Sequence, residues 1–70
     1  MNEIDKITIR ELVILEHLKK GLSNEKISGE VGITVNTVKF HLKKIYKKLN
    51  VINRVQAINK YNEITNEKTF

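Results

Sequence analysis

The chain has 70 residues, enough for one domain with a single small core. It contains no cysteine, which excludes disulfides, thiolate metal sites and thiol nucleophiles. Thirteen lysines and arginines against eight acidic residues give a net charge of +5, a balance that favours a polyanionic partner. No signal peptide and no apolar segment of membrane length is recognisable, so we expect a cytoplasmic protein.

The first expected helix begins after Thr8, because Thr8 and Glu11 have the spacing of a capping box. Apolar residues then recur at helical spacing toward and just past Gly21, which is a natural helix stop. These apolar residues are Ile14, Leu15, Leu18 and Leu22.

Residues 23–48 predict two further helices joined by a sharp turn at Gly32. Ser23 and Thr34 each precede a periodic segment, so their hydroxyls are the expected N-caps. The second of these helices covers about residues 35–49. Its apolar stripe consists of Val38, Leu42, Ile45 and Leu49.

The side of this second helix that faces away from the stripe carries a different set of residues. At about 100° per residue, the set comprises Asn36, Lys39, Phe40, Lys43 and Lys47. Lysines bind phosphates or guanine, an amide can read adenine, and an aromatic ring can contact a thymine methyl, so this ridge suits a DNA major groove. Lys44 and Lys48 flank the ridge and could neutralise further phosphates. The alternative is a lysine face that is merely solvated.

The distribution of charge favours the DNA interpretation. Residues 34–60 contain seven basic residues and no acid, whereas residues 1–33 contain five basic and six acidic residues. A one-sided positive patch attracts a polyanion and gains affinity from the release of counterions. An anionic membrane is also a polyanion, but the apolar stripe is needed for the core of so small a chain. We therefore expect no membrane partner.

A fourth helix is expected from Asn53 to about residue 62 or 63, because Asn53 and Gln56 again have N-cap spacing. Its core-facing residues are Ala57, Ile58 and Tyr61. Its neighbouring face, which a second copy of the chain could contact, carries Val55, Asn59 and Asn62.

These elements predict one all-α domain over residues 1–70, with four helices and no sheet, unlike a winged helix. The ordered core should cover about residues 7–63. The arm at residues 1–6 and the tail at residues 65–70 are expected to fray.

An enzymatic function is not indicated. His17 and His41 lie on different expected helices, and neither has a second ligand at metal-binding spacing, so we expect structural or phosphate-contacting roles. No glycine-rich phosphate loop, nucleophile elbow or pair of carboxylates occurs. We expect neither catalysis nor a metal nor a cofactor.

The chain resembles the LuxR/GerE-type helix-turn-helix domain of bacterial transcription regulators in five segments. They are ITIRE at 7–11, GLSNEKIS at 21–28, TVKFH at 37–41, KKLNV at 47–51 and NR at 53–54. The resemblance covers about residues 7–61. It implies sequence-specific binding of double-stranded DNA by a transcription regulator, with a recognition helix of about residues 35–49 in the major groove.

The resemblance also assigns roles to single residues. It places Lys39, Phe40 and Lys43 near bases, and Thr37 and Lys47 near phosphates. It makes Glu11 a helix-start residue, which we expect to cap the helix or to pair with a basic group such as Arg54. A weak homodimer through the fourth helix and a contact with RNA polymerase are further partners that it suggests.

Departures from the family pattern and rival functions remain open. Ser28 stands where the family has a buried alanine, so we expect either looser packing or a hydroxyl bonded to a carbonyl. Leu12 and Val13 make the first helix apolar around much of its circumference, which indicates either a docking surface or ordinary packing. One rival is a small protein that binds and titrates a larger regulator, and the other is a domain like region 4 of a sigma factor.

Overall fold

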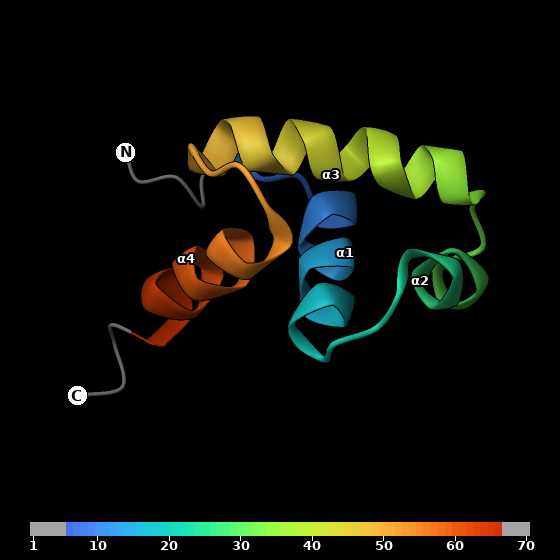
Figure 1. Cartoon of the computed structure of the whole chain (residues 1–70), viewed down its shortest axis with the longest axis horizontal. Coiled ribbons are helices and arrows are strands. Elements are labelled where there is room, and N and C mark those ends of the chain that lie inside the picture. Colours follow the sequence, from blue (N-terminus) through green and yellow to red (C-terminus); the bar gives the residue numbers. More distant parts are fainter. Residues whose placement is uncertain (1–5, 67–70) are drawn as a thin grey trace.

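Four helices and their connecting turns make up the described part of the chain, residues 6–66, in a computed structural model of the protein (Figure 1). They are α1 (Ile9–Lys19), α2 (Asn24–Val31), α3 (Val35–Leu49) and α4 (Arg54–Asn66). No strand occurs between residues 6 and 66. The expected all-α fold is therefore confirmed, and the bounds of α3 agree with those expected for the recognition helix.

The last helix is longer than the sequence predicted. α4 continues to Asn66, about one turn beyond the expected end, and Thr65 Oγ1 donates to the Tyr61 carbonyl at 3.0 Å. Thr65 thus belongs to α4 and not to a tail. The rest of the expected arm and tail, residues 1–5 and 67–70, lies outside the described residues.

Each helix begins after a residue whose side-chain oxygen accepts a hydrogen bond from the backbone N–H three residues later. The pairs of acceptor and donor are Thr8–Glu11, Ser23–Lys26, Thr34–Thr37 and Asn53–Gln56. At Thr8 the bond is reciprocated, because Glu11 Oε1 accepts from the Thr8 N–H at 3.0 Å. At Asn53 it is not, since the Gln56 side chain accepts from the Ile52 N–H instead. All four expected helix starts are confirmed.

A residue in the left-handed backbone conformation ends each of α2 and α3. Gly32 has φ 80°, and its N–H donates to the Ser28 carbonyl at 2.9 Å. Asn50 has φ 59°, a conformation that asparagine adopts more readily than most residues with a side chain. The Ser28 hydroxyl donates to the Glu25 carbonyl at 2.7 Å, which is one of the two outcomes expected for this position. Local backbone chemistry therefore sets the turn between α2 and α3.

One face of every helix enters a common core. α1 packs against each of the other three helices, and Figure 1 shows it between α2 and α4, with α3 lying across its N-terminal end. The Tyr61 hydroxyl of α4 donates to the Glu16 carboxylate of α1. Burial, this hydrogen bond and the Glu16 charge together raise the pKa of Tyr61 to about 12. Most members of the expected stripes are buried: Ile14, Leu15, Leu18, Ile27, Val38, Leu42, Ile45, Leu49, Ala57 and Tyr61. Leu22 and Ile58, which were also expected in these stripes, are partly buried and pack against this core.

Candidate nucleic-acid interface

The two faces of α3 are as the helical period predicted. Val38, Leu42, Ile45 and Leu49 are buried. The opposite side exposes Asn36, Lys39, Phe40, Lys43, Lys44 and Lys47. Among the described residues, Lys39, Lys43 and Lys47 have no ion-pair partner. Their ammonium groups are therefore available to an external anion.

Phe40 is an apolar patch within this basic face. Its side chain is 58% exposed, although an aromatic ring gains most by burial. The Lys44 ammonium lies 5.2 Å from the ring centroid, a cation–π geometry, and the His41 ring meets Phe40 edge-on at 5.9 Å. The sequence placed Lys44 on the flank of the ridge, and the structure brings it onto the Phe40 ring. Phe40 and Lys44 thus place an apolar ring and a positive charge side by side on the exposed face of α3.

Thr37 takes part in the start of α3. It is half-buried, and its hydroxyl lies 2.8 Å from the Thr34 hydroxyl, which also accepts from the Thr37 N–H. Because either hydroxyl can be the donor, Thr37 retains hydrogen-bonding capacity toward a phosphate. The bond to Thr34 holds the Thr37 side chain in one orientation.

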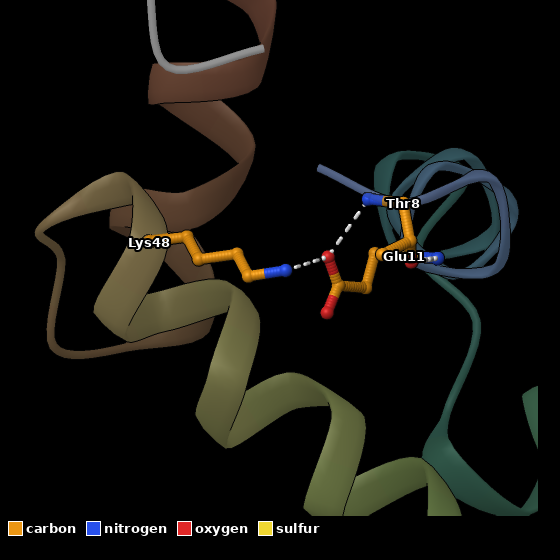
Figure 2. Close-up of polar contacts among 3 residues, drawn as sticks. All are labelled: Thr8, Glu11 and Lys48. Carbon is orange, nitrogen blue, oxygen red and sulfur yellow. Dashed lines mark hydrogen bonds and ion pairs between the residues drawn. The ribbon is translucent and has the colours of Figure 1, made fainter. Parts of the chain in front are cut away.

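Lys48 differs from the other lysines of α3. Its Nζ lies 2.7 Å from Glu11 Oε1 (Figure 2), and its side chain is only 26% exposed. Lys48 is therefore paired with an acid, whereas the sequence grouped it with the phosphate-binding lysines. At about 100° per residue Lys48 lies roughly 180° from Lys39, so the helical period did contain a signal that separates the two.

Glu11 is 2% exposed and is the one buried charged residue described between residues 6 and 66. Burial by itself raises the pKa of Glu11. The hydrogen bond and charge of Lys48, together with the bonds to Thr8, outweigh burial and lower the pKa below its ordinary 4.5. Glu11 therefore caps α1 and also pairs with a basic group, which are the two roles expected for it. The basic group is Lys48, however, and not Arg54, the example that the sequence suggested.

Arg54 instead connects the start of α4 to the beginning of α2. Its Nη1 donates to the Leu22 carbonyl and its Nη2 to Asn24 Oδ1, each at 2.8 Å. The planar guanidinium can reach two acceptors at once, which an ammonium group cannot do with the same geometry. Arg54 thus ties the start of α4 to the beginning of the helix-turn-helix unit.

The outer face of α4 is only partly apolar. Val55 is 66% exposed and Asn59 is exposed, whereas Asn62 is half-buried. The buried Oδ1 of Asn62 has no hydrogen-bond partner within the described residues. Sequence reasoning missed Ile52, an apolar residue outside every stripe that is 81% exposed just before α4. Ile52 and Val55 together offer more apolar surface than Val55 alone.

The two histidines have different surroundings. His17 Nδ1 lies 2.7 Å from the Val13 carbonyl, and its Nε2 lies 3.8 Å from Glu30 Oε1. His41 Nδ1 is buried without a hydrogen-bond partner in the described part of the chain. Residues 6–66 contain no group of three or more potential metal ligands and enclose no pocket. None of their helices is long and apolar enough to cross a membrane.

Comparisons with known proteins found a matching family and several similar proteins. The family described as bacterial regulatory proteins, luxR family, matches residues 5–61. The HTH-type transcriptional regulator AlkS of Alcanivorax borkumensis is 44% identical over 52 residues, which are 74% of this chain and 6% of that protein. The probable transcriptional regulatory protein SgaR of Hyphomicrobium methylovorum is 44% identical over 55 residues, 79% of this chain and 26% of that protein.

The glycerol metabolism activator of Pseudomonas putida is 48% identical over 52 residues. These cover 74% of this chain and 24% of that protein. The chain thus spans about a quarter, or less, of the length of these curated relatives. The shared part of each relative has the size of the four-helix domain described above.

Proposed function

We propose that this chain, which belongs to the luxR family of bacterial regulatory proteins, binds double-stranded DNA in a sequence-specific manner and regulates transcription. One observation carries the proposal. The exposed face of α3 presents Lys39, Lys43 and Lys47, none of which has an ion-pair partner among the described residues, outside the stripe that fixes α3 to the core. The family match also favours this family over the sigma-factor resemblance.

The exposed side chains of α3 suit the two kinds of contact that a major groove requires. Lys39, Phe40 and Lys43 would approach base edges, where an ammonium can donate to guanine and the Phe40 ring can contact a thymine methyl. Asn36, an exposed amide near the start of α3, has the chemistry to read adenine. Thr37, Lys44 and Lys47 would contact phosphates, which fix the register of the helix on the duplex.

Selection of bound sites from random duplexes, followed by titration at several salt concentrations, tests this function. The logarithm of affinity should fall linearly with the logarithm of salt concentration, by about 0.9 per phosphate contact. Lys39→Ala and Lys43→Ala should each cost about 1–3 kcal/mol at particular base positions. Lys20→Ala is the matched control, because Lys20 is an exposed lysine at the end of α1 that lies away from α3 (Figure 1).

Two results would contradict the proposal. One is a loss of affinity in Lys20→Ala as large as that in Lys39→Ala, which would mean attraction by net charge alone. The other is failure to recover any bound duplex. Co-purification of a longer regulator in place of DNA would then support the titration function.

The same proposal includes a weak homodimer through the start of α4. Ile52 and Val55 are exposed apolar residues three positions apart, and Asn59 adds a polar edge. This surface is small, so we expect two copies to associate on an inverted repeat with half-sites about one helical turn apart. Val55→Glu would place like charges across the two-fold axis and should abolish cooperative binding while half-site binding persists. Unchanged cooperativity would place the interface elsewhere, with Leu12 and Val13 as the next candidates.

A contact with RNA polymerase stays a prediction from the family resemblance, and no residue of the chain is assigned to it. A DNA-binding role would place the protein with the nucleoid in the bacterial cytoplasm.

A further inference from the structure

We propose that Lys48 is a positioning residue of the recognition helix: held by Glu11, it fixes the C-terminal end of α3 to the start of α1 and contacts no phosphate. This inference rests on the proposed DNA-binding function. It gives Lys48 a different role from the exposed lysines of α3, with which the sequence grouped it.

The geometry of the pair is specific (Figure 2). A single carboxylate oxygen, Glu11 Oε1, accepts from Lys48 Nζ at 2.7 Å and from the Thr8 N–H at 3.0 Å. The Thr8 hydroxyl in turn accepts from the Glu11 N–H, so the backbone of the first turn of α1 holds the carboxylate in place. Lys48 is therefore bound to a preformed acceptor on α1, 37 residues away in the chain.

Transfer of Lys48 to a phosphate would be unfavourable. Glu11 is 2% exposed, and a buried carboxylate that loses its cation keeps the cost of desolvation without compensation. Exposed lysines on the same helix carry no such penalty when they bind DNA. Salt also screens a partly buried pair less than exposed charges, so the Glu11–Lys48 pair should persist at salt concentrations that weaken phosphate contacts.

The position of Lys48 on the helix explains what the pair controls. Lys48 lies about 180° around α3 from Lys39. Lys48 and Lys39 therefore lie on opposite flanks of the apolar stripe, each about 90° from its centre. Apolar contacts alone allow small rotations of a helix about its axis, because they are not directional. An ion pair on one flank resists such a rotation, and so it fixes the direction in which Lys39 and Lys43 point on the other flank.

Three variants and the unsubstituted protein test the inference. Lys48→Met removes the ammonium and keeps the unbranched side chain. Lys47→Met is the matched control, because Lys47 is the adjacent lysine, is exposed and has no ion-pair partner between residues 6 and 66. Glu11→Gln combined with Lys48→Met removes the stranded carboxylate as well. Affinity for a selected duplex is measured over a series of salt concentrations, and thermal unfolding is followed by circular dichroism.

We expect Lys47→Met to lower the log–log salt slope by about 0.9 with little change in Tm. Lys48→Met should leave the slope unchanged, lower Tm and weaken binding several-fold by the same factor at every salt concentration. The combined variant should recover part of both the Tm and the affinity, because no unpaired carboxylate remains. Measurements well below the Tm of every variant separate weaker binding from partial unfolding.

A slope that falls by about 0.9 in Lys48→Met would overturn the inference, because it would show that Lys48 contacts a phosphate. Unchanged affinity with a lowered Tm would also overturn it, since the pair would then stabilise the fold without positioning α3. If Lys48→Met does not fold, the slope of the combined variant distinguishes the same outcomes. Failure of the unsubstituted protein to bind any duplex would instead refute the proposed function itself.

Discussion

Arg54→Met should destabilise the protein, because it removes the guanidinium that ties the start of α4 to the beginning of α2. The substitution deletes the donors to the Leu22 carbonyl and to Asn24 Oδ1, which lie 2.8 Å from the two guanidinium nitrogens. Methionine keeps much of the aliphatic length of arginine, so most of the packing along the side chain is retained. The measured change should therefore report mainly on the two hydrogen bonds.

The size of the effect follows from these bonds and from the exposure of Arg54. A hydrogen bond to a charged group contributes about 1.5–3 kcal/mol to stability. Arg54 is half-buried, so water can replace part of each bond after the substitution. We expect a loss of about 2 kcal/mol in the free energy of unfolding, which lowers the Tm of a domain of this size by about 8–16 °C.

Thermal and urea unfolding, followed by circular dichroism, measure this change. Arg54→Lys keeps the charge but cannot reach both acceptors with a planar fork, so we expect about half of the loss. Lys47→Met is the control for removal of a cation, and it should change the free energy of unfolding by no more than about 0.5 kcal/mol. A Tm of Arg54→Met within about 2 °C of the unsubstituted protein would show that the two bonds contribute no net stability.

Three further predictions concern Glu11, the start of α3 and the exposed ring. The pKa of Glu11 is lowered in the folded protein, so its ionised carboxylate stabilises the fold above about pH 4.5. This stabilisation is lost as the pH falls through the lowered pKa. The Tm of the unsubstituted protein should therefore fall toward that of Glu11→Gln on acidification, and a constant difference between the two would contradict the assignment. Thr34→Ala removes the N-cap of α3 and should lower the free energy of unfolding by about 1 kcal/mol, or the Tm by about 4–8 °C. Thr34→Ser keeps a hydroxyl and should retain most of the stability. Equal losses in the two variants would argue against the capping bond. Phe40→Ala should keep its helicity by circular dichroism while the selected sites lose a preference for thymine, and a large drop in helicity would refute the exposed placement.

The sequence alone determined the features that depend on neighbouring residues. Thr8, Ser23, Thr34 and Asn53 were identifiable as helix starts because an N-cap and its donor lie three residues apart. The apolar stripe of α3 and its exposed opposite face followed from the helical period for the same reason. Local spacing fixes these features before any helix contacts another.

The tertiary structure alone decided which charged side chains meet across the fold. The sequence suggested Arg54 as a basic partner of Glu11 and grouped Lys48 with the phosphate-binding lysines, and nothing in their local sequence shows that Lys48 is the partner instead. The packing of α3 across the start of α1 brings Lys48 to Glu11 over a separation of 37 residues (Figure 2). The start of α4 lies instead beside the turn that precedes α2, so Arg54 bonds there. Such pairings depend on the relative orientation of whole helices, which the spacing of residues along one helix does not specify.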